Sequence, residues 1–203
     1  MADPIVFSGN VDWSGENPGI SLKTKADGPF TSLASFFRVV LSPHGRGHAL
    51  VLAMSPHDAN PPAERGNYCF HDNDPLAHYL VREFVSNFGA WKGLPGLANL
   101  HYRRLDSVET SGDPLSSYSE TVNAPDMTIR LTWSGLGKAF CFALPPDRSA
   151  TGRHHMPSLF VGCSDATITV NGVALPGKPV PREVAGHSIS TAMLAFSETW
   201  IRT

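Results

Sequence analysis

Short segments rich in Val, Ile, Thr, Phe and Tyr recur along the chain, and Gly, Pro, Asn and Asp separate them. Such segments, bounded by turn-forming residues, are typical of β-strands. The pattern predicts strands over 4–13, 19–25, 31–42, 48–54, 66–71, 99–109, 116–123, 127–133, 138–144, 158–163, 166–171 and 187–202. We therefore expect a chain that is mainly β.

Several joins between these segments predict tight turns. SPHGRGH (42–48) predicts a hairpin between the third and fourth segments, and WSGLGK (133–138) predicts another between 127–133 and 138–144. The pair Asn171–Gly172 predicts a two-residue turn, because both central residues of that turn need positive φ.

Residues 75–88 carry a helical pattern instead. Asp74 offers an N-cap oxygen, and Pro75 occupies the first helical position, where its missing N–H costs nothing. Gly89 is expected to supply the left-handed residue that ends the helix. One apolar stripe is formed by Leu76, Leu80, Val81, Phe84, Val85 and Phe88. A sheet is the only partner available to cover this stripe.

Many strands with one helix predict a single β-rich domain over 1–203. The expected architecture is an antiparallel β-barrel or a curled β-sandwich of about ten strands, with the helix packed against it. Such folds often enclose one small ligand.

Charge and composition narrow the function classes. The 16 basic and 18 acidic residues give a net charge of −2, without the basic surface that nucleic-acid binding requires. The apolar runs are too short to span a bilayer, and the N-terminus lacks the pattern of a signal peptide. The three cysteines form no CxxC motif, which argues against a cysteine-based zinc site and for a reducing compartment. We expect a cytoplasmic protein with neither a nucleic-acid nor a membrane partner.

Two adjacent histidines lie in TGRHHMPSLF (151–160). Neighbours in an extended chain point in opposite directions, so at most one of His154 and His155 faces a cavity, and joint binding of one ion is awkward. No established metal-binding motif such as HExxH occurs, and no metal or cofactor is predicted. His155 is the residue expected at the mouth of a site, where it would assist proton transfer. The alternative is that both are ordinary loop or strand histidines.

Three charged residues interrupt apolar rows of the predicted strands. Arg38 interrupts a row in 34–40, Glu120 one in 118–122, and Glu198 the row Ser190, Ala192, Leu194, Phe196, Trp200. A buried charge either pairs or shifts its pKa, so Arg38 is the natural counter-ion for Glu120 or Glu198. A desolvated Glu would have a raised pKa and could act as a general base. Alternatively, these residues face solvent or form a structural ion-pair network.

These rows predict a site in the interior or mouth of the fold. The predicted catalytic residues are Glu198, Glu120, Arg38 and His155. The residues predicted to contact the substrate are His101, Tyr118, Trp133 and Trp200.

Three function classes follow. The first is a cofactor-independent enzyme, a lyase, isomerase or cyclase, that acts on a small organic molecule, anionic or aromatic. The second is a non-catalytic protein that binds such a ligand in the same cavity. The third and weaker class is an interaction module that uses the proline-rich loops 55–66 and 175–183.

Overall fold

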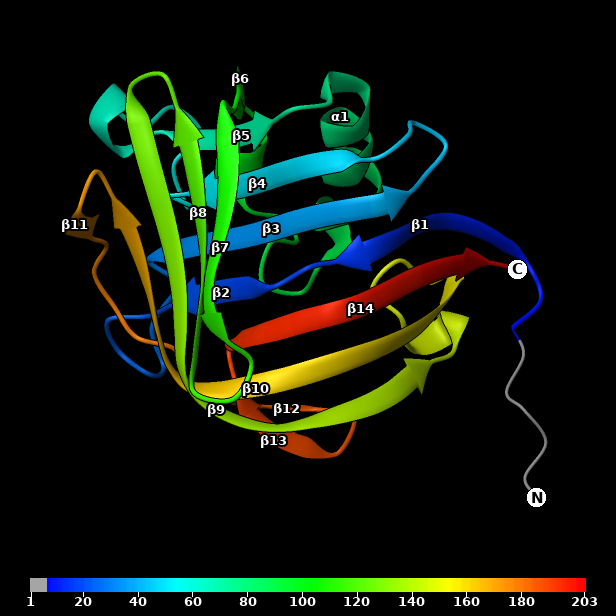
Figure 1. The fold of residues 1–203 in the computed structure, drawn as a ribbon. Coiled ribbons are helices and arrows are strands. Elements are labelled where there is room, and N and C mark those ends of the chain that lie inside the picture. Colours follow the sequence, from blue (N-terminus) through cyan, green and yellow to red (C-terminus); the bar gives the residue numbers. More distant parts are fainter. Residues whose placement is uncertain (1–6) are drawn as a thin grey trace.

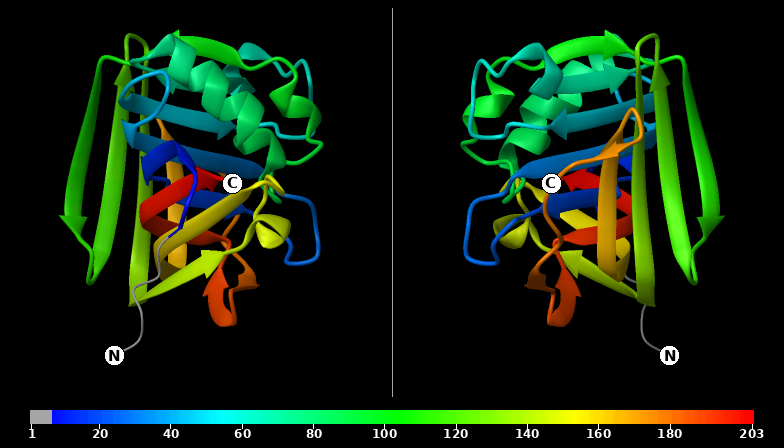
Figure 2. Two further views of the ribbon diagram at one scale, coloured as in Figure 1. Left: turned by 90° about the vertical axis from the view of Figure 1, so that its right-hand side faces the viewer. Right: turned by 90° about the vertical axis from the view of Figure 1, so that its left-hand side faces the viewer.

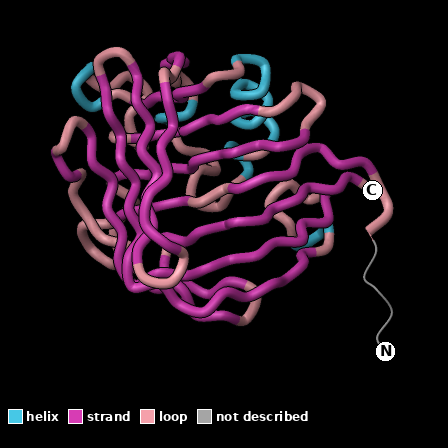
Figure 3. Tube along the Cα trace, in the orientation of Figure 1, coloured by secondary structure: helices cyan, strands magenta, loops and turns pink. Residues whose placement is uncertain are grey.

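The computed structural model describes residues 7–203 and is mainly β (Figure 3). Residues 4–6 of the first predicted strand lie outside the described residues. The strands are β1 (Asn10–Glu16), β2 (Gly19–Leu22), β3 (Ser32–Leu41), β4 (Gly47–Ala53), β5 (Asn67–His71), β6 (His101–Arg104), β7 (Ser107–Asp113), β8 (Ser117–Ala124), β9 (Met127–Leu144), β10 (His154–Val170), β11 (Val173–Ala174), β12 (Pro181–Val184), β13 (His187–Ser190) and β14 (Ala192–Arg202). The helices are α1 (Asp74–Glu83) and the short 3-10 helices η1 (Ala63–Arg65), η2 (Val85–Asn87), η3 (Pro95–Leu97) and η4 (Pro146–Arg148).

Twelve strands form one sheet, and β12 and β13 form a separate hairpin. The main path of the sheet has the order β6-β5-β4-β3-β1-β14-β10-β9-β8-β7 (Figure 1). Strand β2 pairs with β3 and β14, and β11 pairs with β10. The pairing of β5 with β6 is parallel, whereas the other pairs are antiparallel.

Two of the predicted turns are confirmed. Residues 42–46 join the antiparallel strands β3 and β4. Asn171 and Gly172 have φ values of 50° and 80° and join β10 to β11. Positive φ at both positions is what a tight two-residue turn requires.

The predicted hairpin over 133–138 is wrong. Residues 127–144 form the single strand β9, which pairs with β10 on both sides of this segment. Gly135 has a φ of 60°, and a Cβ atom there would clash with the Ser164 hydroxyl. The pairing of β9 with β10 shifts register between Val161 and Cys163. The glycine therefore allows a bend with an irregular register instead of a reversal of the chain, and β10 likewise unites two predicted strands.

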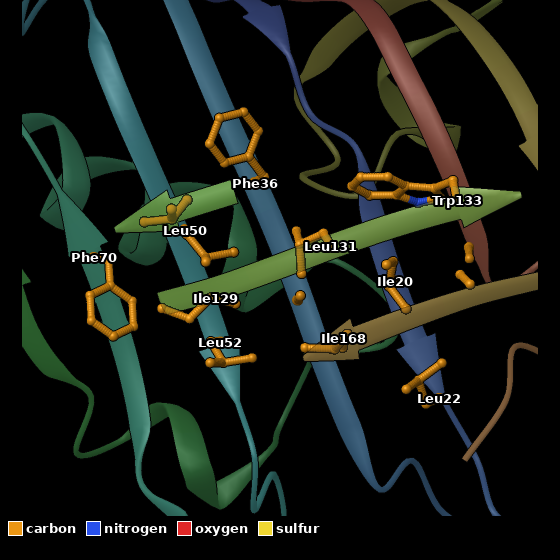
Figure 4. Close-up of a cluster of buried hydrophobic side chains, with 14 of the residues drawn as sticks. Ile20, Leu22, Phe36, Leu50, Leu52, Phe70, Ile129, Leu131, Trp133 and Ile168 are labelled. Carbon is orange, nitrogen blue, oxygen red and sulfur yellow. The ribbon is translucent and has the colours of Figure 1, made fainter. Parts of the chain in front are cut away.

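The bend brings two parts of the sheet face to face. In Figure 1, β7, β8 and the first half of β9 cross in front of β3 and β4. Apolar side chains from both parts fill the space between them, including Phe36 and Leu50 on one side and Leu131 and Trp133 on the other (Figure 4). The indole N–H of Trp133 donates to the backbone oxygen of Gly19 at 3.1 Å. Trp133 is thus a core residue that ties the two parts together.

Helix α1 covers the opposite face of β3–β5, away from β7 and β8 (Figure 2). The predicted apolar stripe is buried except for Phe88, which is half-buried. The ends of the helix differ from the prediction, and the last three stripe residues follow α1. The N-cap is Asn73, whose side-chain oxygen accepts from Leu76 N at 3.2 Å, and not Asp74. The α-helix ends at Glu83 and is followed by η2, while Gly89 does not adopt a left-handed φ. Bonds from Trp91 N and Lys92 N to the Phe88 oxygen continue the turn without a glycine stop.

Replacing Asn73 with Ala is expected to lower the free energy of unfolding by about 1–2 kcal/mol. Besides capping the helix, its amide donates to the backbone oxygens of His44 (2.9 Å) and Arg46 (3.1 Å). Urea denaturation of Asn73→Ala and Asp74→Ala would test this assignment. A larger loss for Asp74→Ala would contradict it.

Within residues 7–203, no helix has the length and apolar character needed to cross a bilayer.

Candidate ligand-binding cavity at Glu198

A β-bulge in β14 decides which way its side chains point. Leu159 of β10 lies opposite Ser197, but the next residue, Phe160, lies opposite Ala195. Phe196 is therefore an extra residue in β14. An extra residue interrupts the strict alternation of side chains between the two faces of a strand.

The predicted apolar row of β14 consequently changes face at the bulge. Leu194 belongs to the core between the two parts of the sheet, and Phe196 packs against that core. Trp200, beyond the bulge, belongs to the cluster that includes the α1 stripe. Glu198, two residues before Trp200, lies on the same side as Trp200. The prediction of one continuous row through Glu198 is wrong for this reason.

Glu198 borders a cavity of about 300 Å³. One part of the wall comes from Asn17, which follows β1, and from β2, β3 and the segment after η2. The other part comes from the second half of β9, the first half of β10, the loop around η4, β12 and β14. Its apolar lining includes Phe88, Trp91, Phe142, Met156 and Phe160. Its polar lining includes Asn17, Ser35, Arg148, Arg182, Thr191 and Glu198. An apolar pocket with a few convergent polar groups is typical of a small-molecule site.

The Glu198 carboxylate is bonded on one oxygen only. Its Oε1 accepts from Trp200 Nε1 at 2.6 Å and from Asn17 Nδ2 at 3.4 Å. Ser35 Oγ donates to Asn17 Oδ1 at 2.8 Å, which turns the Asn17 amide toward the carboxylate. No hydrogen bond is made to Oε2 from residues 7–203. One oxygen of an oriented carboxylate is thus left available at the cavity.

Burial raises the pKa of Glu198 from 4.5 to about 7. The side chain is 3% exposed, and loss of water disfavours its charged form. The hydrogen bonds from Trp200 and Asn17 offset part of this increase. At neutral pH the carboxyl group therefore exists in both protonation states, as a group that accepts and returns a proton requires.

Trp200 forms part of the same cavity wall. Its ring packs between Trp13 and Phe88, with ring centroids 6.3 and 5.8 Å away. The indole N–H that binds Glu198 is therefore held by packing as well as by its hydrogen bond.

Arg38 and Glu120 meet elsewhere, between the two parts of the sheet. Arg38 Nη2 lies 3.0 and 3.1 Å from the two Glu120 oxygens, and Nη1 binds Glu16. Glu120 also accepts from the Tyr118 hydroxyl at 2.8 Å and from Thr110 Oγ1 at 2.9 Å. Both oxygens of this buried carboxylate are thus fully bonded, in contrast to Glu198. Arg38 is the counter-ion of Glu120 and not of Glu198.

This Arg38–Glu120 ion pair connects β3 to β8 across the core. Neither residue of the pair borders the Glu198 cavity. Arg38 is partly exposed and borders a separate surface pocket instead. The Tyr118 hydroxyl donates to Glu120 of this pair, and the Tyr118 ring packs edge-on against Phe196 with centroids 5.1 Å apart. The arrangement is that of a structural ion-pair network, which the sequence analysis left open as an alternative.

The two adjacent histidines point in opposite directions, as expected for an extended chain. His155 is partly buried beside the Phe7 ring (5.1 Å) and does not border the cavity. His154 is fully buried, with Nε2 2.7 Å from Asp12 Oδ2 and Nδ1 2.6 Å from Thr151 Oγ1. Burial lowers the pKa of His154, while its bond to Asp12 offsets part of this decrease. These two hydrogen bonds connect the start of β10 to β1 and to the loop that precedes β10.

The remaining predicted contact residues lie away from the cavity. His101 is exposed on β6, with its ring 5.6 Å from that of Tyr68, and Trp133 is in the core. Of the eight predicted residues, only Glu198 and Trp200 border the Glu198 cavity.

The polar residues of this cavity that the sequence did not predict include Asn17, Ser35, Arg148, Arg182 and Thr191. Arg182 lies at the end of the proline-rich segment 175–183, which was interpreted as a surface loop. No periodicity marks these residues, because each comes from a different part of the chain.

Among residues 7–203, no three His, Cys, Asp or Glu side chains come together as metal ligands would. No protein-family model matches the chain, and comparisons with curated proteins and with solved structures gave no significant match. The interpretation of the cavity therefore depends on its own geometry.

Proposed function

We propose that the protein is an acid–base enzyme of the lyase, isomerase or cyclase type that acts on a small organic molecule without a cofactor. The observation that carries the proposal is the Glu198 carboxylate, which is buried, held on one oxygen and unbonded on the other at the edge of a cavity.

In this mechanism the charged form of Glu198 takes a proton from a C–H or O–H group of the substrate. The O–H bond forms on Oε2, and the electron pair of the broken bond stays on the substrate. Return of the proton to another atom gives an isomerase. In a lyase the electron pair forms a double bond, the leaving group departs with its own bonding pair, and Oε2 passes the proton to that group. Trp200 and Asn17 keep Oε1 in place throughout, so the proton is exchanged at Oε2.

The second candidate is a non-catalytic protein that binds a ligand in the same cavity. The aromatic lining supports it, because Phe142 and Phe160 pack edge to face with centroids 4.8 Å apart and offer a wall to a flat ligand. The two candidates differ in whether a bound molecule loses a proton.

We further infer that the architecture is the curled sandwich and not the closed barrel. The order of the sheet supports this, since it runs from β6 at one end to β7 at the other without a pairing that joins them in the described residues. The single domain over 1–203, the cytoplasmic location and the role of the proline-rich loops stay predictions.

Solvent exchange tests the proposed function without knowledge of the product. The protein would be incubated in D₂O with 5-oxohexanoate or 5-oxo-6-phenylhexanoate, whose acidic C6 protons lie at the end away from the carboxylate, and loss of these proton signals would be followed by NMR. We expect protein-dependent exchange that Glu198→Gln lowers at least ~100-fold, the scale of general-base catalysis. Glu109→Gln, an exposed change on β7, is the matched control and should exchange at the original rate.

Two results would contradict the acid–base assignment. One is equal exchange by the original protein and Glu198→Gln. The other is binding of these acids in the cavity with no protein-dependent exchange, which would favour the non-catalytic candidate.

A further inference from the structure

Two arginines on different elements border the Glu198 cavity. Arg148 ends η4, and Arg182 lies on β12. Neither forms a salt bridge with any of residues 7–203. Arginines that do pair with carboxylates are Arg38, Arg82, Arg103, Arg153 and Arg202. The cavity is therefore bordered by two cations that lack a counter-ion within the described part of the chain.

The Arg182 guanidinium has an unusually poor partner. Its Nη2 lies 3.6 Å from the Met193 sulfur, and a thioether is a weak acceptor. Surrounding protein lowers the pKa of Arg182 by desolvation, and no carboxylate raises it again. Arg182 and Arg148 are both exposed residues that border the cavity, so an anion that enters the cavity can reach them. A guanidinium in this position gains most from an anion that enters the cavity.

The positions along β14 suggest the shape of the ligand. Met193 contacts Arg182 and so lies at the Arg182 end of the cavity. Met193 and Glu198 are five residues apart in β14, and the bulge takes up one of these residues. At about 3.3 Å per residue, their Cα atoms are separated by roughly 13 Å. Phe160 pairs with Ala195 between them and presents an aromatic wall. A ligand that reaches both ends is thus elongated, charged at one end and apolar in the middle.

We propose that Arg182, assisted by Arg148, forms an anion subsite for the carboxylate of an elongated aromatic or unsaturated monocarboxylic acid, whose far end reaches Glu198. The proposal rests on the proposed function, since it names the substrate class of the same cavity. A guanidinium binds a carboxylate through two parallel hydrogen bonds, which fixes orientation as well as charge. A second anionic group at the far end would meet the Glu198 carboxylate, so a monoanion fits better than a dianion.

Three matched probes test the subsite by calorimetry: 3-phenylpropanoate, its neutral amide 3-phenylpropanamide, and 2-phenylethylphosphonate. We expect the carboxylate to bind at least tenfold more tightly than the amide. Arg182→Gln should remove this preference and leave the affinity for the amide unchanged. Arg104→Gln, an exposed change on β6 outside the cavity, should keep the preference. Thermal unfolding of each variant would check that it is folded.

Several outcomes would overturn the subsite. They are equal binding of carboxylate and amide, a preference that survives Arg182→Gln, tighter binding of the phosphonate than of the carboxylate, and no binding of any probe at millimolar concentration. The exchange assay with Glu198→Gln separates this failure from that of the proposed function. Exchange that depends on Glu198 but not on Arg182 would retain the enzyme and reject the subsite. A carboxylate preference that depends on Arg182, without proton exchange, would retain the subsite and reject the enzyme.

Discussion

Replacing Arg38 with Met is expected to lower the free energy of unfolding by about 3–5 kcal/mol. The substitution keeps an unbranched side chain but removes the cation that Glu120 faces across the core. Glu120 is fully buried and would be left with only the Tyr118 and Thr110 hydroxyls. A buried carboxylate without its cation must either stay charged in a poor solvent or take up a proton, and both cost free energy.

Denaturant unfolding of a double-mutant cycle would measure this effect. Arg38→Met and Glu120→Gln would be compared singly and together, with Arg104→Met as an exposed control. The double variant should recover much of the loss of Arg38→Met, because the uncompensated charge is gone. A loss below ~1 kcal/mol, or no recovery in the double variant, would contradict the role of this pair in joining β3 to β8.

Glu198→Gln is expected to stabilise the protein above neutral pH, although it removes the proposed catalytic group. The raised pKa means that the folded chain keeps the Glu198 proton up to about pH 7, whereas the unfolded chain releases it near 4.5. Folding therefore becomes less favourable as pH rises from 4.5 to 7, by about 3 kcal/mol in total. Gln carries no titrating proton, so this loss should disappear from the variant.

The measurement is urea unfolding of both proteins at pH 5, 6, 7 and 8. The stability difference between Glu198→Gln and the original protein should increase by about 2.5 kcal/mol over this range, because part of the total change already lies below pH 5. The other charged or titratable groups near the site are the Arg148 and Arg182 guanidinium groups at the cavity and the His154 imidazole, whose ring lies 5.6 Å from that of Trp200. They are present in both proteins, so their titration largely cancels. A difference that stays constant with pH would reject the raised pKa.

The two results for Glu198 are informative together. Loss of proton exchange combined with a gain in stability would show that the carboxylate opposes folding at neutral pH and serves the activity. Natural proteins keep such residues where function requires them.

Features set by local sequence were predicted well. The α1 stripe, the turn at 42–46 and the Asn171–Gly172 turn follow from spacing and backbone preference within a few residues. The hairpin at 133–138 was not real, because Gly135 marks a bend as readily as a reversal. Only the pairing of β9 with β10 on both sides of Gly135 distinguishes the two.

The candidate site was predicted in part. Glu198 was predicted as a site residue because it is a charged residue in an apolar row, but the bulge at Phe196 breaks that row. A bulge depends on the partner strand and leaves no period in the sequence. Arg182 was not predicted, because only tertiary packing brings its hairpin, β12 and β13, beside the cavity.

The position of β14 has a consequence for how the site comes into being. The last strand in chain order lies in the middle of the sheet, between β1 and β10, and it carries Glu198. Its bond from Ser14 to Thr199 closes a loop of 185 residues. A contact between residues so distant in sequence costs chain entropy before its favourable interactions form, and this cost slows folding. The strands on either side can form hairpins early, but the carboxylate and its cavity are assembled only when β14 inserts between β1 and β10.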